Sequence, residues 1–401
     1  MPETVSNPIV PPVSTAAVDR PIAPALPSRD PRPMARVLID AVQGAPAQAY
    51  PWEQIDPHAL LRASLTHGVT PALAVHLRGR DDVPTALTER LQGCYRDQLA
   101  RHIRTLADLR KLAAILNDAG FTWAVVKGPA LAERLWPRPD LRLYVDLDIV
   151  IERRRLGDSV ALLEASHVKL VDRNWPFILG RVQGELSMAL PYGTPLDLHW
   201  HLVNDQRLRR TFSFPMDDVL GRSIPTVLGS VEAPVLDPVD TVLHLAYHMV
   251  HSGGHRLVWL KDFDLAVSVP ELDWTALYAR AEQYGCVLAL ALSLQRTQRV
   301  LQPVEGYPAP HRGGAWAQLA AAADRWRPVP QLPGERRSGR IVFQSTRATV
   351  STSAVAAGFA AAGRSREEDA EPGAPNPLHI VNDDLEARRR YFDMVAARRQ
   401  P

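Results

Sequence analysis

The stretch FTWAVVKGPALAERLWPRPDLRLYVDLDIVI, residues 121–151, decides the fold. Its pattern of apolar and polar residues predicts a strand over 122–126, a tight turn, a short helix over 129–136 and a second strand over 142–151. Glycine and proline in the turn, and two prolines in the loop before the second strand, separate these elements. The rest of the chain is organised around this strand–turn–helix–strand unit.

The second strand carries two aspartates on one face. Asp146 and Asp148 are two positions apart, so their side chains point the same way and their Cα atoms are roughly 6.5 Å apart. The residues that alternate with them are apolar. We therefore expect a half-buried strand whose polar face grips a hard cation such as Mg²⁺, or two cations roughly 3.5–4 Å apart. A solvated polar face is the alternative explanation.

The turn after the first strand reads Lys127-Gly128-Pro129. Glycine allows a tight turn or a close approach of a ligand to the backbone, and proline fits the first position of a helix. The helix N-terminus offers free N–H groups to an anion, with Lys127 beside them. The chain has four lysines and 42 arginines, so arginine is its usual basic residue and a lysine at this position is an exception. We interpret the turn as a phosphate-binding element; a lysine that merely extends from the strand end into solvent is the alternative.

A third strand, over 195–202, repeats the division into two faces. Asp197 and His199 alternate with apolar residues in the sequence PLDLHWHL. If this strand lies beside the one that carries Asp146 and Asp148, Asp197 becomes a third carboxylate on the same surface, with His199 next to it. The ordinary polar face of an amphipathic strand is the alternative.

Helical periodicity dominates the chain before the central unit. Residues 1–33 contain nine prolines and predict a disordered tail. The helices expected after it span 34–42, 57–67, 71–77 and 84–119, the last as one long helix or a broken pair. The buried stripe expected on the last of them consists of Leu91, Leu99, Ile103, Leu106, Leu109 and Leu112.

Strands give way to helices after the central unit. A helix is expected over 156–166, and strands over 176–182 and 185–190. Later helices are expected over 237–252, 273–284, 287–301 and 314–326. The remainder of the chain has no steady periodicity apart from a short helix over 384–398.

The helix over 237–252 carries three histidines on one face. His244, His248 and His251 are at positions i, i+4 and i+7. With Asp262 or Asp264 they could bind a transition metal, because imidazole and carboxylate suit zinc or iron. Packing and hydrogen bonding between helices is the alternative, and the histidines could also line an acceptor pocket that faces the carboxylates.

Composition narrows the class of protein. The formal net charge is +2 over 401 residues, which gives no bulk attraction to nucleic acid or acidic membranes. The two cysteines, Cys94 and Cys286, form no metal motif and favour a reducing compartment. The sequence has no signal-peptide pattern and no apolar run near the ~20 residues of a membrane helix. We therefore expect a soluble cytoplasmic protein.

The ordered set of motifs resembles the polymerase-β-like nucleotidyltransferase superfamily, and more narrowly its uncharacterised nucleotidyltransferases. The resemblance covers roughly residues 34–301 and includes a His-x-x-x-His helix followed by a Trp-Leu-x-Asp stretch. The motifs that carry it, in order, are Lys127-Gly128, Arg142-x-x-x-Asp146-x-Asp148, Leu196-Asp197-Leu198-His199-Trp200, His244 with His248, and Trp259-Leu260-Lys261-Asp262.

The resemblance implies an α+β fold. Its centre is a polymerase-β-like nucleotidyltransferase core, a small mixed sheet with flanking helices, between N- and C-terminal helical regions. The boundaries we assign are 1–33 for the disordered proline-rich tail, 34–120 for the N-terminal helical segment, 121–205 for the core, 206–326 for the C-terminal helical domain and 327–401 for a mostly disordered tail.

The resemblance also implies a chemistry, the transfer of a nucleoside monophosphate from an NTP to an acceptor, with pyrophosphate leaving. It implies that Asp146, Asp148 and Asp197 hold two Mg²⁺ ions. Asp197 would hold the ion nearer the nucleophile and help to activate the acceptor hydroxyl.

The implied nucleotide site is built on the turn. Lys127 and the backbone of Gly128 would hold the triphosphate, with His199 as a further candidate for nucleotide binding. Arg142 could touch a phosphate, although we favour a structural ion pair for it. Many superfamily members have serine after this glycine, whereas this chain has Pro129, which removes a hydroxyl and an N–H from the phosphate loop.

Three functions follow from these observations. The leading hypothesis is a Mg²⁺-dependent nucleotidyltransferase that acts on a small molecule, or on a peptide or protein, with no nucleic acid or membrane partner. The second is a protein of the same fold that binds a nucleotide or a partner without catalysis, which the Gly-Pro turn favours. The third is a metal-dependent phosphohydrolase that uses the three histidines.

Overall fold

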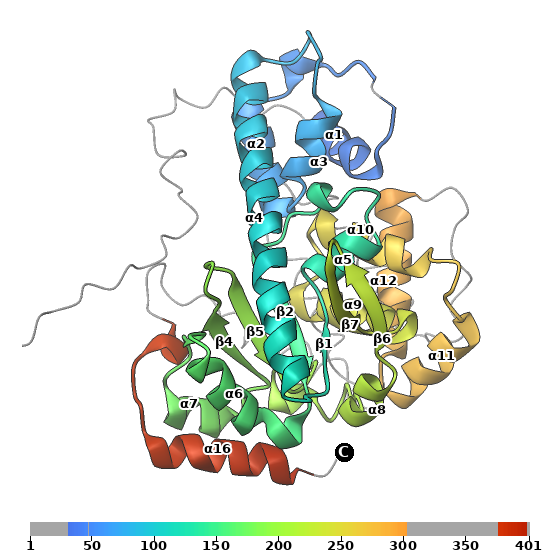
Figure 1. Ribbon diagram of the computed structural model, residues 1–401. Helices are drawn as coiled ribbons and strands as arrows, with labels where there is room; N and C mark the ends of the chain where they lie inside the picture. Colours follow the sequence, from blue (N-terminus) through green and yellow to red (C-terminus); the bar gives the residue numbers. More distant parts are fainter. Residues whose placement is uncertain (1–30, 47, 303–375, 399–401) are drawn as a thin grey trace, which may run out of the picture.

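The computed structural model describes residues 31–46, 48–302 and 376–398 (Figure 1). The expected α+β class is confirmed, because these residues form a mixed sheet with helices packed around it. The expected helix over 314–326 lies outside the described residues, as do residues 1–30 and 327–375 of the two expected tails.

The first helices are those that the periodicity predicts. They are α1 (Pro31–Gln43), α2 (Pro57–His67), α3 (Thr70–His76) and α4 (Thr85–Asp118), with a 3-10 turn η2 (Trp52–Gln54) after the first. The carboxylate of Asp56 accepts a hydrogen bond from the N–H of His58 and caps α2, and left-handed Gly68 ends it. Helix α4 is continuous over 34 residues and connects the N-terminal helices to the sheet.

The buried stripe expected on α4 is wrong in its middle. Leu99 and Ile103 are exposed, whereas Gln98 and His102 are buried. This part of α4 packs on the loop before the second central strand, which presents polar groups. The amide of Gln98 donates to a backbone oxygen of that loop, and His102 lies 2.8 Å from the hydroxyl of Tyr144. The helix therefore turns a polar side inward here.

The described strands form one seven-stranded sheet in the order β3-β4-β5-β2-β1-β7-β6. They are β1 (Trp123–Val125), β2 (Leu147–Ile151), β3 (Lys169–Leu170), β4 (Glu185–Ala189), β5 (Pro195–His199), β6 (Ile224–Leu228) and β7 (Val231–Val235). β2 pairs with β5, and β1 with β7, in parallel; the other neighbours are antiparallel. The hairpin of β6 and β7 joins this sheet from outside the segment 121–205.

One expected strand is wrong. Residues 176–182 lie in and just after helix α7 (Trp175–Arg181). Trp175, Ile178 and Val182 are buried at positions i, i+3 and i+7, which is the spacing of one helical face. A proline in the first turn, where its missing N–H costs nothing, completes the helical signal.

The central strand β2 is shorter and more buried than expected. It begins at Leu147, and all of its residues are buried, so the strand is not half-exposed. Each face of the sheet contacts its own hydrophobic core. Ile149 packs in the core that contains residues of α6 and α16, and Val150 packs in the core that contains residues of α9, α10 and α12. The polar face of β2 is therefore covered.

Helices surround the sheet on both sides (Figure 1). Those around the core are α5 (Pro129–Arg134), α6 (Leu156–Ala165), α8 (Met216–Gly221) and the 3-10 turns η3 (Pro139–Leu141), η4 (Arg153–Arg155), η5 (Gln206–Leu208) and η6 (Pro377–His379). The C-terminal set comprises α9 (Pro238–Ser252), α10 (Leu257–Val267), α11 (Trp274–Gln283) and α12 (Val287–Leu301). No helix within the described ranges combines the length and apolar character needed to cross a bilayer.

The short helix expected over 384–398 is present as α16 (Leu385–Ala397). It packs against α6 and α7, which are distant from it in the sequence (Figure 1). Its Tyr391 is fully buried, and the hydroxyl accepts a hydrogen bond from the indole N–H of Trp200, the residue that follows β5. Helix α16 thus supports the sheet from the side opposite α9.

Candidate functional site

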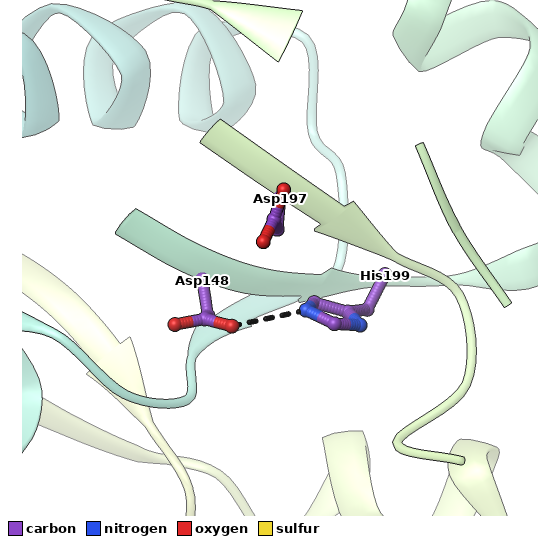
Figure 2. A group of neighbouring side chains, drawn as sticks. All are labelled: Asp148, Asp197 and His199. Carbon is purple, nitrogen blue, oxygen red and sulfur yellow. Dashed lines mark hydrogen bonds and ion pairs between the residues drawn. The ribbon is translucent and has the colours of Figure 1, made fainter. Parts of the chain in front are cut away.

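Strand pairing brings two of the predicted carboxylates together. β2 and β5 are parallel neighbours, and Asp148 is the direct partner of Asp197 in their register. Figure 2 shows both side chains on the same side of the sheet, together with His199 from the end of β5. One ligand atom from each of these three residues lies within 4.8 Å of the other two. The strand of Asp197 therefore lies beside the strand of Asp148, which is the condition for the shared carboxylate surface expected from the sequence.

His199 joins this group to a fourth side chain. Its Nε2 lies 3.2 Å from Oδ1 of Asp148, the contact drawn in Figure 2. Its Nδ1 lies 3.2 Å from Oε2 of Glu185, which comes from the antiparallel neighbour β4. The imidazole thus lies between two carboxylates. On the same strand as Glu185, the hydroxyl of Ser187 donates to Asp197 over 3.2 Å.

Lys127 supplies the positive charge of the site. Its Nζ lies 2.8 Å from Oδ1 of Asp148, the same oxygen that His199 contacts. The lysine side chain is 20% exposed and the aspartate side chain 3%, so part of the lysine side chain reaches the surface while its partner does not. Lys127 therefore connects the buried carboxylates to the exterior.

Gly128 is required by the backbone of the turn. It adopts φ +58°, and a Cβ there would lie 2.7 Å from the backbone oxygen of Asp146. A side chain at this position would be both strained and in collision. The glycine therefore lets the turn after β1 press against the start of β2.

Arg142 is engaged in a structural ion pair. Its Nε and Nη2 donate to the two carboxylate oxygens of Asp262 in α10, each over 2.8 Å, and its Nη1 donates to the backbone oxygen of Gly128. The indole N–H of Trp136 donates to the same aspartate. The ion-pair role favoured from the sequence is therefore the one observed. This pair anchors the loop before β2 to the C-terminal helices, which explains why the strand does not extend back to residue 142.

The carboxylates of the site differ in their electrostatic environment. Burial acts to raise the pKa of Asp148, but the charge of Lys127 and the contact with His199 outweigh it and hold this pKa well below its usual range. Burial, and then the charge of Asp148, raise the pKa of Asp197 to about 6. Asp148 is therefore firmly ionised, whereas Asp197 is mostly ionised at pH 7 and takes up a proton as the pH falls through about 6.

Asp146 lies beside this group. Within the described residues, the set of three close ligand atoms does not include it. Burial and the charge of Asp148 raise its pKa, and the charges of Lys127 and Arg142 oppose that rise. The carboxylate is thus within electrostatic reach of the site, but it precedes β2 and does not share the register of Asp148 and Asp197.

The histidine helix α9 approaches the same site. Burial lowers the pKa of His244 well below 6.5, and the charge of Lys127 lowers it further. The same two causes act on His248. The metal set proposed from these histidines with Asp262 or Asp264 is not assembled in the described part of the chain: Asp262 is bound to Arg142 and Trp136, and the close ligand group lies elsewhere.

Sequence reasoning missed two contributors to the site. Glu185 and Ser187 occupy alternate positions of a strand that was expected, and they pair directly with His199 and Asp197. Their alternation placed them on one face. However, nothing in the local sequence indicated that β4 would lie beside β5 with this face toward the carboxylates.

The arrangement suits a divalent cation. Two neighbouring carboxylates and an imidazole can all donate to one ion, and a bound cation would offset the burial and the charge of Asp148 that raise the pKa of Asp197. Lys127, which is partly accessible, can serve as a point charge for a phosphate group. These groups could therefore hold a metal ion and place a positive charge beside a phosphate group.

The chain is similar to proteins already known. A solved crystal structure, an antigenic nucleotidyltransferase-like protein from Paracoccidioides brasiliensis, aligns at 19% identity and a TM-score of 0.30, covering 47% of this chain and 92% of that one. No curated protein matches significantly. The sequence model of a family described as uncharacterised nucleotidyltransferase matches residues 53–302. The chain therefore belongs to the uncharacterised nucleotidyltransferase family.

Proposed function

We propose that the protein is a metal-dependent nucleotidyltransferase that moves a nucleoside monophosphate from an NTP to a small molecule, or to a peptide or protein. The observation that carries this proposal is the direct pairing of Asp148 with Asp197, with Lys127 2.8 Å from Asp148. Family membership supports the general activity. The acceptor class and the metal are the parts that need direct tests.

The side chains divide the work as follows. Asp148 and Asp197, with Asp146 beside them, would hold Mg²⁺, which supplies charge stabilisation for the attacking and leaving oxygens of an in-line displacement. Lys127 would release Asp148 and bind the phosphates of the NTP. Asp197, whose pKa is about 6, would hold or accept the proton of the acceptor hydroxyl.

The surroundings of the site favour a small or peptidic acceptor. The net charge of +2 provides no field for a nucleic-acid polymer. The wall opposite the carboxylates is helix α9, where His244 and His248 are neutral and able to accept or donate hydrogen bonds. Both cysteines are unpaired, which suits a reducing compartment, and we place the activity in the cytoplasm.

The test is binding and turnover of the four NTPs with Mg²⁺, measured by calorimetry and by pyrophosphate release. Water or the protein itself serves as the first acceptor. The Asp146→Ala/Asp148→Ala variant should lose both signals and keep its circular dichroism spectrum. Asp118→Ala, which removes an exposed carboxylate at the end of α4, is the matched control and should behave as wild type.

A second function, nucleotide or partner binding without catalysis, is favoured by one specific feature. Pro129 takes a donor and a hydroxyl out of the turn that would hold the triphosphate. NTP binding by the wild type without pyrophosphate release, across all four nucleotides, would support this second function. Absence of both binding and release at millimolar NTP would reject the transferase.

A further inference from the structure

The ligand set of the site contains an imidazole that a magnesium site does not need. Mg²⁺ prefers oxygen ligands in octahedral geometry, whereas imidazole nitrogen suits the first-row transition metals. His199 contributes one of the three ligand atoms that lie within 4.8 Å of one another. The other two come from Asp148 and Asp197 (Figure 2). The group is therefore mixed in chemistry.

Glu185 lies where a carboxylate usually orients a metal-binding histidine. Metal ligands of this kind usually donate their second ring N–H to a carboxylate, which fixes the tautomer and raises the basicity of the other nitrogen. The Nδ1 of His199 lies 3.2 Å from Oε2 of Glu185, at ion-pair distance but outside hydrogen-bond geometry in the described residues. A proton shifted to Nδ1, beside Glu185, would free the lone pair of Nε2 for a metal ion that replaces the present contact of Nε2 with Asp148, 3.2 Å away.

The other wall of the site carries an independent sign of a missing ligand. His244 is 4% exposed, and neither of its ring nitrogens has a hydrogen-bond partner among the described residues. It interacts electrostatically with Lys127, His199 and Asp148, so it borders the same group. A buried polar side chain without a partner is costly and commonly marks a place that a water, ion or ligand fills.

The ammonium group of Lys127 lies where a metal ion would contact Asp148. Its ammonium group contacts the oxygen of Asp148 that faces His199, and it is held there by one flexible side chain that is 20% exposed. A divalent ion of higher charge can displace it without moving the backbone. The site is thus compatible with metal entry.

We propose that Asp148, Asp197 and His199 bind a divalent first-row transition metal, with Nε2 of His199 as a direct ligand and Glu185 as the residue that positions it. This inference rests on the proposed function, because it names the metal class for the same site. It replaces an all-carboxylate Mg²⁺ site with a mixed one that prefers Mn²⁺ and its neighbours over Mg²⁺.

The test uses Mn²⁺ alone, without nucleotide, on the full chain stripped of metal. Electron spin echo envelope modulation of bound Mn²⁺ reports a directly coordinated nitrogen. We expect nitrogen modulation in the wild type and its loss in His199→Asn. His167→Asn is the matched control, because this exposed histidine adopts φ +65°, which asparagine tolerates. It should keep the wild-type signal.

Affinities measured by calorimetry give a second readout. His199→Asn should raise the Kd for Mn²⁺ at least about tenfold and leave the Kd for Mg²⁺ within about threefold. Glu185→Gln should keep the nitrogen modulation while raising the Kd for Mn²⁺ roughly tenfold. His199→Asp supplies an oxygen in place of the nitrogen, so it should bind both metals, lose the modulation and favour Mg²⁺ more than the wild type does.

Several results would overturn the inference: no nitrogen modulation in the wild type, modulation that survives in His199→Asn, or equal losses of Mn²⁺ and Mg²⁺ affinity in that variant. Failure of the proposed function is a separate result. Turnover of NTP with Mg²⁺ and no nitrogen ligand would reject the inference and keep the transferase. Nitrogen-ligated Mn²⁺ without NTP binding or turnover would do the reverse.

Discussion

Two buried ion pairs involve the Lys127-Gly128 turn, one through Lys127 itself and one through a hydrogen bond from Arg142 to Gly128, and they differ in how completely their charges are paired. Arg142 and Asp262 meet through two hydrogen bonds of 2.8 Å, and their side chains are 7% and 1% exposed. Lys127 meets Asp148 through one contact of 2.8 Å, and its side chain is 20% exposed. We call the Arg142–Asp262 pair the closed pair, because both carboxylate oxygens are bound and both side chains are buried. We call the Lys127–Asp148 pair the open pair, because it has a single contact and the lysine is partly exposed.

The difference separates a structural ion pair from a functional one. The fork of Arg142 matches both carboxylate oxygens, and its partner has a further donor in Trp136, so removing either charged residue leaves the other buried and unpaired. The ammonium of Lys127 is a point charge on a flexible stem, and its partner belongs to a crowded group of acids. We expect the closed pair to determine stability and the open pair to exchange with ligands.

The largest expected effect follows from removing the carboxylate of the open pair. Asp148→Asn should lower kcat by roughly 10⁴-fold, because the loss of metal binding removes several kcal/mol of transition-state stabilisation. Initial-rate pyrophosphate release checks this, with circular dichroism as the test of folding. Activity within tenfold of the wild type would show that the pair of aspartates is not the metal site.

The next effect concerns the closed pair. Arg142→Met should lower the free energy of unfolding by about 3–5 kcal/mol, because it leaves the carboxylate of Asp262 buried and unpaired. Chemical denaturation measures this change. The double variant Arg142→Met/Asp262→Leu should recover most of the loss. A double variant as unstable as the single one would contradict the closed-pair explanation.

The contrast between the pairs also explains what the sequence could predict. Alternation in the segments that hold Asp148 and Asp197 gave both strands and the side on which the acids lie, because strand periodicity is local. The partner of Arg142 lies 120 positions away, and no local pattern identifies it. Helix α7 was missed because a proline near its start and several apolar residues also fit a strand. The contributions of Glu185 depend on strand order, which periodicity does not encode.

A smaller, two-sided effect is expected from the lysine of the open pair. Lys127→Met should lower the Kd for a divalent cation in the absence of nucleotide, because the competing ammonium is gone. It should raise the Kd for NTP by roughly 10–100-fold, which is the range of a hydrogen bond to a charged group. Calorimetry with metal alone and then with NTP separates the two. Both affinities falling together would mean that Lys127 holds the site in shape rather than exchanging.

The smallest effect tests the wall that faces the open pair. Burial, and then Lys127, keep the pKa of His244 well below 6.5, with His199 and Asp148 also close by. A histidine whose pKa is lower in the folded state stabilises the fold fully above its unfolded pKa and loses that contribution as the pH falls through it. In His244→Phe this loss disappears, so its free energy of unfolding should fall less steeply than that of the wild type between pH 6 and pH 5. The difference should approach about 1.4 kcal/mol per pH unit.

At pH 7 the two proteins should have free energies of unfolding within about 1 kcal/mol of each other, because phenylalanine replaces two ring nitrogens that have no hydrogen-bond partner among the described residues. Urea denaturation at pH 7, 6 and 5 measures both quantities. His248 titrates in both proteins, and the causes that lower its pKa most, burial and the charge of Lys127, are the same in both. If the free energies of unfolding of the two proteins depend on pH in the same way, His244 is not held neutral in the folded state. The Lys127–Asp148 pair would then be more accessible to water than the burial around it indicates.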